Sequence, residues 1–265
     1  TSFQLADGGS KVLQGALDAT FEITESLMTG FALDSIACTN ELTGNPADVT
    51  LVPNDGKVTV TMSSTQFDVR CVYTNSQLPS LTLIKSVDNG DGGIAAPDDF
   101  NLTVAGNGVS SGVTNTFIAN TPLAINETQL TGYSFVSITG DAKCPDALGG
   151  TITLDPGEDV TCTITNDDIP PQLTLVKNVV NDNNGDATFD QFNLTVGGVP
   201  VNSGESNVYA AGNYAINETQ LPGYEFTIIT GDPKCPSTLG GTITLAVGDN
   251  ITCTITNNDI APTLT

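Results

Sequence analysis

The sequence predicts an all-β protein built as a tandem array of antiparallel β-sandwich domains. The segment from residue 81 to residue 168 returns almost unchanged from residue 173 to residue 259, so the chain repeats itself at about 90 residues. Short runs rich in Thr, Val, Ile and Leu alternate apolar with polar residues, and turn dipeptides such as Asn184-Gly185 separate them. No run has a helical period of useful length. A repeat of this size suits a small domain with its own core rather than the unit of a solenoid.

The two complete copies share five sequence blocks in the same order. The blocks LTLIK, FNLTV, INETQLTGY, LGGTITL and CTITNDD of the first copy return as LTLVK, FNLTV, INETQLPGY, LGGTITL and CTITNND. Each block has the length and alternation of a strand, so one copy holds enough short strands for two facing sheets. We predict domains at residues 79–170 and 171–260, joined by short linkers that contain proline and restrict the chain.

The first 78 residues follow the same order with one block absent. The segment Phe3 to Gly9 matches FNLTVGG, Ile23 to Phe31 matches INETQLPGY, and Cys71 to Asn75 matches CTITN. No block of the LTLIK type precedes Phe3. We therefore predict that residues 1–78 form a sandwich without its opening strand.

The last residues of the chain resemble the start of that opening block. Residues 261–265 include Thr263, Leu264 and Thr265, which follow a proline as the LTL blocks do. We predict that they begin the strand of a next repeat or act as a donor strand.

Composition excludes several classes of function. The chain has 7 basic and 30 acidic residues, a formal net charge of −23, which makes nucleic acid and anionic membranes unfavourable partners. It contains no histidine and no apolar stretch long enough to insert into a bilayer. Because a nucleophile elbow and a metal-ligand cluster are also missing, we do not expect an enzyme that acts on an external substrate.

We expect no cofactor, and calcium is considered only at acidic turns and at the domain junctions. The turns at residues 88–91 and 182–186 resemble fragments of calcium loops but lack the ligand spacing of an EF-hand, so turn chemistry is the preferred interpretation. Asp167-Asp168 and Asn258-Asp259 lie at the predicted domain junctions, where carboxylate oxygens would suit a calcium ion.

Six cysteines fall two to a repeat. A chain without a CxxC motif and without histidine is a poor candidate for zinc or redox chemistry. One disulfide per repeat in an oxidising, extracellular compartment is the favoured interpretation, and free buried thiols are the alternative. The expected pairs are Cys38 with Cys71, Cys144 with Cys162, and Cys235 with Cys253.

Three polar residues of each complete repeat fall on the apolar side of their strands. Residues two apart in a strand share a face. Lys85 therefore lies with Leu81 and Leu83, and the same alternation turns the other members of the set inward. The full set is Lys85, Glu127 and Asn166 in one repeat and Lys177, Glu218 and Asn257 in the next. Burying an ammonium, a carboxylate and an amide is unfavourable unless they satisfy one another, so each trio should meet.

This layout resembles a known family. A lysine in the opening strand, an E-T-x-x-x-G-Y block and an asparagine in the closing strand resemble the prealbumin-like, Cna B-type and SpaA-like Ig-like domains of bacterial surface proteins and pilins. The resemblance covers nearly the whole chain and implies an Ig-like fold at the cell surface. Many members form an intramolecular isopeptide bond between Lys and Asn with a Glu or Asp as catalyst. Carried over, this assigns Lys85–Asn166 with Glu127 and Lys177–Asn257 with Glu218. A buried Lys–Glu salt bridge with Asn as hydrogen-bond partner is the alternative.

The incomplete repeat keeps Glu25 and Asn75 but has no lysine at the matching position. An open sandwich exposes a strand edge that can pair with a strand of another chain, and head-to-tail repetition of that contact gives a fibre. The donor strand would dock between the sheet of residues 3–9 and the closing strand of residues 71–75. The alternative is a boundary inside a longer covalent array.

The sequence thus predicts a structural subunit of an extracellular filament, pilus-like fibre or surface stalk, which assembles with copies of itself. Disulfides, and isopeptide bonds where they form, would staple its domains, and bond formation within the chain would be its only catalysis. The alternative is an adhesin or ligand-binding module that presents a loop or face to a carbohydrate or host protein. With no Trp and only 5 Tyr, no aromatic face marks such a site.

Overall fold

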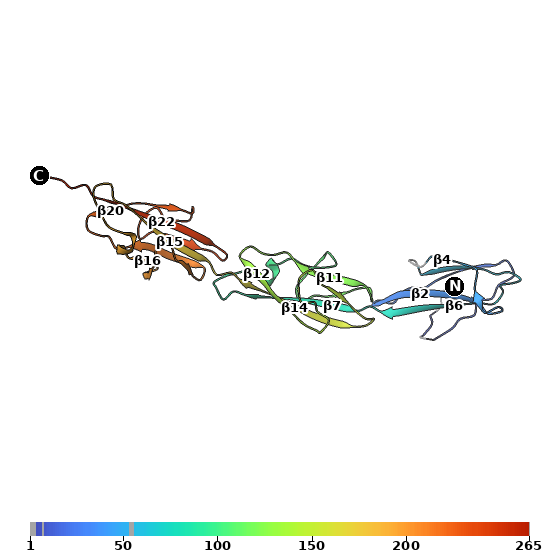
Figure 1. Ribbon diagram of the computed structural model, residues 1–265. Helices are drawn as coiled ribbons and strands as arrows, with labels where there is room; N and C mark the ends of the chain where they lie inside the picture. The colour runs from blue at the N-terminus through green and yellow to red at the C-terminus, as the bar shows by residue number, and fades with distance from the viewer. Residues whose placement is uncertain (1–3, 7, 53–55, 265) are drawn as a thin grey trace. The chain divides into compact units, whose positions relative to one another are not determined.

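The computed structural model describes residues 4–6, 8–52 and 56–264, and it confirms the all-β class. Among these residues, strands form six sheets, two for each repeat, and the 3-10 turns η2 (Pro97–Asp99) and η3 (Phe189–Gln191) accompany them (Figure 1). By internal packing the chain divides into two compact units, residues 1–81 with 115–121 and 153–160, and residues 82–114 with 122–152 and 161–265. None of the helical segments in the described part is long and apolar enough to cross a membrane.

The third repeat consists of two four-stranded sheets. Their strand orders are β18-β15-β22-β20 and β17-β16-β19-β21. The bounds are β15 Gln172–Val180, β16 Leu194–Val196, β17 Val199–Val201, β18 Ser206–Val208, β19 Gly212–Glu218, β20 Tyr224–Gly231, β21 Thr242–Leu245 and β22 Asn250–Asp259. Alternate apolar residues of both sheets bury into one core, among them Leu173, Leu175, Ile216, Ile243 and Ile255.

One strand pair departs from the predicted antiparallel arrangement. β15 and β22, the first and last strands of the repeat, run parallel, with Lys177 paired to Ile255 and Val179 paired to Asn257. The other recorded pairs of this repeat are antiparallel. A parallel pair needs a long connection rather than a hairpin, and here the rest of the repeat supplies it.

The second repeat has the same topology. Its sheets have the orders β10-β7-β14-β12 and β13-β11-β8-β9, so β7 and β14 occupy the places of β15 and β22. The bounds are β7 Ser80–Asp88, β8 Leu102–Val104, β9 Asn107–Val109, β10 Thr114–Thr116, β11 Pro122–Glu127, β12 Tyr133–Gly140, β13 Thr151–Thr153 and β14 Asp159–Asp168.

The first repeat is smaller and less well buried. Its sheets, β3-β2-β6 and β1-β5-β4, have three strands each. The bounds are β1 Thr20–Thr24, β2 Phe31–Asn40, β3 Asn45–Pro46, β4 Val49–Val52, β5 Lys57–Thr61 and β6 Val69–Gln77. Within the described part of this repeat, the buried apolar side chains are Val58 and Val60. No described strand covers the edge of β6 opposite β2, the edge at which β22 pairs with β15 in the third repeat.

The prediction that residues 3–9 form a strand equivalent to FNLTV is wrong for the described residues of that segment. Residues 4–6, 8 and 9 lie in no strand, and the first strand is β1; Phe3 lies outside the described residues. In β16 of the third repeat, Leu194 and Val196 are buried in a complete core. Leu5 is 51% exposed. In the third repeat β16 pairs with β19, whereas the corresponding edge of β1 has no described strand beside it.

Candidate functional site

The three inward polar residues of the third repeat meet inside its core. Lys177 comes from β15, Glu218 from the end of β19 and Asn257 from β22. Lys177 Nζ lies 3.0 Å from Glu218 Oε2 and donates a hydrogen bond of 2.6 Å to Asn257 Oδ1. All three residues are buried, Asn257 completely. The strand alternation of this repeat therefore brings an amine, a carboxylate and a carboxamide into one closed site.

The second repeat builds the same site from β7, β11 and β14. Lys85 Nζ lies 2.8 Å from Glu127 Oε2 and donates a hydrogen bond of 2.5 Å to Asn166 Oδ1. These residues are also buried. The same geometry thus recurs where the same residue types occupy the same strand positions.

Two further residues of each site escaped the sequence reasoning. Gln129 Nε2 donates to Glu127 Oε1 at 2.8 Å, and Gln220 Nε2 donates to Glu218 Oε1 at 2.9 Å. The amine also faces an aromatic ring, with Lys85 Nζ 4.2 Å from the centre of Phe100 and Lys177 Nζ 4.4 Å from that of Phe192. Such a contact stabilises a cation. The sequence held a signal for these residues. Both residue types lie in blocks shared by the two copies, and the glutamine follows the glutamate by two positions.

The environment of each site lowers the pKa of its lysine. Burial lowers the pKa of Lys85 and of Lys177 below the ordinary value of 10.5, and the hydrogen bond and charge of the neighbouring glutamate oppose that effect. The neutral amine, which is the nucleophilic form, is therefore more accessible than in an exposed lysine. Asn166 Nδ2 and Asn257 Nδ2 are buried and have no hydrogen-bond partner among the described residues.

The first repeat holds two of the three groups. Asn75 Nδ2 donates a hydrogen bond of 2.8 Å to Glu25 Oε1. The second carboxylate oxygen, Glu25 Oε2, is buried and has no partner among the described residues. Lys57 lies elsewhere, in an ion pair with Glu22 at 2.8 Å. The described part of this repeat thus places no lysine at the pair.

Three disulfides hold the repeats, one in each. Cys38 pairs with Cys71, Cys144 with Cys162 and Cys235 with Cys253, as expected. Cys38 and Cys71 face each other on neighbouring strands of one sheet, whereas Cys144 and Cys235 lie in loops and reach a strand.

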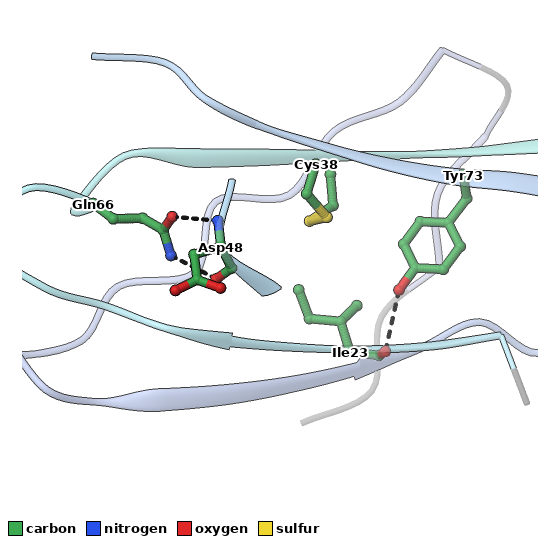
Figure 2. The surroundings of a disulfide bond; sticks show 6 residues. Ile23, Cys38, Asp48, Gln66 and Tyr73 are labelled. Carbon is green, nitrogen blue, oxygen red and sulfur yellow. Dashed lines mark hydrogen bonds between the residues drawn. A yellow bond between two sulfur atoms is a disulfide. The ribbon is translucent and has the colours of Figure 1, made fainter. Parts of the chain in front are cut away.

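Figure 2 shows the surroundings of the first disulfide. The Gln66 side chain accepts from the Asp48 N–H and donates to the Asp48 carbonyl. Tyr73 of β6 donates from its hydroxyl to the Ile23 carbonyl of β1 at 3.1 Å (Figure 2). Tyr73 therefore links the two strands that lead to Asn75 and Glu25.

Two acidic residues at the predicted domain junctions accept hydrogen bonds from backbone N–H groups. Asp168 accepts hydrogen bonds from the N–H groups of Asp91 and Gly93, and Asp259 accepts from the N–H groups of Asp182, Asn183 and Gly185. Burial raises the pKa of Asp259, but the backbone bonds outweigh it and hold that pKa below its usual range. These carboxylates close the turns that we considered for calcium. No group of three or more His, Cys, Asp or Glu side chains suited to a metal ion occurs among the described residues.

The end of the chain carries an exposed apolar residue. Thr263 and Leu264 belong to no strand, and the Leu264 side chain is fully exposed. Thr265 lies outside the described residues.

Comparisons with known proteins identify the domain type. Residues 77–164 and 168–255 match one family model described as a prealbumin-like fold domain, and residues 2–77 match a second of the same description. No curated protein sequence matches the chain.

Among solved structures, the Bacillus anthracis TIE protein is 14% identical with a TM-score of 0.39, and the match covers 91% of this chain and 52% of that one. The chain thus spans about half the length of that protein. A C-terminal fragment of the pilus adhesin SpaC from Lactobacillus rhamnosus GG is 17% identical with a TM-score of 0.32, over 71% of this chain and 100% of the fragment. The major pilin protein of Streptococcus pyogenes is 13% identical with a TM-score of 0.27, over 92% and 99%. Because the family models cover well over half of its residues, the chain belongs to the SpaA-type family of prealbumin-like fold domains, present here in tandem.

Proposed function

We propose that the protein is a structural subunit of an extracellular filament, pilus-like fibre or surface stalk, assembled head to tail with copies of itself. The buried trio in each complete repeat carries this proposal. Each trio is closed to solvent, so it is not placed to act on an external substrate. Instead it connects β15 with β22, and β7 with β14, the first and last strands of a repeat. A link at that place would let tension pass from one end of a repeat to the other without unfolding it.

The trios suit formation of an intramolecular isopeptide bond. Lys177 would pass one proton to Glu218, and its neutral amine would attack Cγ of Asn257 while that proton is shared with the carbonyl oxygen as charge develops there. The bond from Cγ to Nδ2 then breaks, the amine proton passes to the leaving nitrogen, and ammonia departs. Proximity within a folded core supplies a large part of the lowering of the barrier. Lys85, Glu127 and Asn166 would react in the same way.

The first repeat would be completed by a donor strand. The third repeat pairs a lysine-bearing strand in parallel with its closing strand, and the corresponding edge of β6 has no described neighbour. Main-chain hydrogen bonds to β6 and burial of leucine side chains would stabilise such a contact. The segment Thr263-Leu264 resembles the start of an LTL strand, the strand type that fills this position in the complete repeats.

Electron microscopy of the purified chain with a competing peptide tests this function. The peptide has the sequence of residues 171–181 with Lys177→Arg, so that it can occupy the β6 edge without forming a bond. We expect filaments from the chain alone and their loss in excess peptide. A scrambled peptide of the same composition should have no effect. Wild-type chain that stays monomeric at high concentration contradicts the assembly proposal.

A further inference from the structure

We propose that the disulfide of each complete repeat fixes the register of the closing strand and thereby controls isopeptide formation, so that the bond forms efficiently only after the thiols are oxidised. This inference rests on the proposed isopeptide chemistry and names its regulation. The closing strands are β14 and β22, which carry Asn166 and Asn257. Each also carries a fully buried cysteine of its repeat, Cys162 or Cys253.

The register of β22 decides which side chain meets Lys177. β22 lies between β15 and β20 in its sheet (Figure 1). In the observed register Ile255 pairs with Lys177, and Asn257 Oδ1 lies 2.6 Å from Lys177 Nζ. A shift of β22 by two residues in either direction would put another side chain at that place. The reaction therefore needs this one register.

The side chains of β22 repeat with a period of two residues. Its central outward positions are all threonine, and its inward positions before the asparagine are isoleucine or cysteine. Alternation excludes a one-residue shift, because that shift would turn the threonines into the core. A two-residue shift replaces most side chains by others of the same kind, so alternation does not exclude it. The outward residues are Thr252, Thr254 and Thr256, and the inward residues are Ile251, Cys253 and Ile255.

The disulfide supplies the missing constraint. Cys253 is bonded to Cys235, which lies in the loop between β20 and β21. The loop is itself hydrogen-bonded to the strand, because the Asp232 N–H donates to the Thr252 carbonyl at 3.2 Å. A two-residue shift would move Cys253 by about 7 Å along the sheet, so the bond with Cys235 holds the observed register.

The second repeat has the same arrangement. β14 carries threonine at its central outward positions, namely Thr161, Thr163 and Thr165. Cys162 of this strand is bonded to Cys144, in the loop between β12 and β13. Both complete repeats therefore combine a closing strand of ambiguous register with a disulfide that removes the ambiguity.

The spacing between cysteine and asparagine is the same in every repeat. The closing-strand cysteine stands four residues before the asparagine, and residues four apart in a strand share a face. The partner cysteine varies, since Cys38 of the first repeat lies on the neighbouring strand β2 rather than in a loop. The constant feature is thus the attachment of the closing strand itself. The pairs are Cys71 and Asn75, Cys162 and Asn166, and Cys253 and Asn257.

Asp259 is a second, non-covalent anchor of the same register. Two residues beyond Asn257, its carboxylate accepts hydrogen bonds from the N–H groups of Asp182, Asn183 and Gly185. Asn257 therefore lies between two anchors. Hydrogen bonds exchange readily with water, whereas a disulfide persists, so oxidation makes the register permanent.

Both covalent steps balance. A small-molecule disulfide such as oxidised glutathione accepts two electrons from the thiols of Cys235 and Cys253, and their two protons appear on the two small thiols released. The isopeptide bond then forms between Lys177 Nζ and Asn257 Cγ as the bond from Cγ to Nδ2 breaks and ammonia leaves. The order follows because the second step needs the register that the first step fixes.

The test follows bond formation in the full chain after cell-free synthesis with either oxidised glutathione or dithiothreitol. Samples taken over time are quenched and the cross-linked peptides are quantified by mass spectrometry. The Lys177–Asn257 bond should form about 10 to 100 times more slowly in dithiothreitol, the range that closing a loop of 18 residues implies. Equal rates overturn this inference and leave the isopeptide chemistry standing. An oxidised chain that loses no ammonia contradicts that chemistry and this inference with it.

Removing one disulfide isolates its effect within a single molecule. The double variant Cys235→Ala and Cys253→Ala should form the bond of the third repeat slowly even in oxidant. The second repeat keeps its disulfide, so the Lys85–Asn166 bond is the internal control. A variant in which both bonds form at the same rate overturns the register lock.

A charge pair across the strands separates register from stability. Thr230 and Thr254 are directly opposite each other in β20 and β22, so Thr230→Lys with Thr254→Glu favours the observed register without a disulfide. Added to the cysteine variant, this pair should restore part of the rate. The matched control places the same charges two residues out of register, as Thr230→Lys with Thr252→Glu, and should restore none. Recovery by both pairs, or by neither, overturns the inference.

Discussion

Gln129 donates a hydrogen bond to one oxygen of Glu127 and leaves the other oxygen, Oε2, facing Lys85. The pair Gln220 and Glu218 repeats this relationship in the third repeat. The first repeat has Leu27 at the corresponding position, and there the Asn75 amide makes the bond to the carboxylate. The glutamine therefore fixes the orientation of the carboxylate in the complete repeats.

Replacing Gln129 by Leu should slow isopeptide formation in the second repeat. A hydrogen bond to a charged group contributes about 1.5–3 kcal/mol, so loss of this orientation should lower the rate about tenfold or more. The measurement is the loss of ammonia with time after refolding, followed by mass spectrometry of peptides from each repeat. The third repeat keeps Gln220 and serves as the internal control. Equal rates in both repeats would show that the glutamine has no positioning role.

The intact mass of the reduced chain should be lower than its sequence mass by two molecules of ammonia. One loss comes from Lys85 with Asn166 and one from Lys177 with Asn257, because each trio has the geometry for the bond. Glu127→Ala should restore one ammonia. It should also lower the free energy of unfolding by about 3–5 kcal/mol, since a buried ammonium loses its partner. A full sequence mass would leave the buried salt bridge as the correct interpretation.

A chain that cannot form the bonds should become more stable as pH rises toward 10.5. In the double variant Asn166→Ala and Asn257→Ala, Lys85 and Lys177 remain buried. Their folded pKa values lie below 10.5, so between the two values the unfolded state binds more protons and the free energy of unfolding rises with pH. Denaturant titrations across that range measure the slope.

The control for the pH experiment adds Lys85→Met and Lys177→Met to the double variant. Contributions from tyrosines are common to both proteins, and burial raises the pKa of Tyr73 and of Tyr209 in this same range. The difference between the two slopes therefore reports the lysines. Identical slopes would contradict the lowered lysine pKa values.

Removing one disulfide should destabilise its own repeat. Cys144 and Cys162 are 18 residues apart, and a loop of this size corresponds to about 3 kcal/mol in the chain-entropy account. The double variant Cys144→Ala and Cys162→Ala should lose about that amount in denaturant melts. Non-reducing peptide mapping of the wild type should find each pair within its repeat, and a pair between repeats would refute this pairing.

Strand alternation allowed much of the site to be predicted. Because residues two apart share a face, the positions of Lys85, Glu127 and Asn166 were sufficient to predict that all three point inward. A buried charge needs a partner, which predicted that they meet. The cysteine pairs followed from one pair recurring in each repeat. These features depend on local periodicity and on the repeat itself, both of which are visible in a linear sequence.

The sequence by itself determined the all-β class, the tandem repeats and the inward polar trios, because each depends on spacing along a strand. Tertiary structure decided what depends on pairing between distant segments. It set the parallel pairing of β15 with β22, the role of Gln129 and the use of Asp259 to close a turn. It also decided that residues 4–6 form no strand, since an alternating pattern is only a preference until the segment pairs with a neighbouring strand and packs against it.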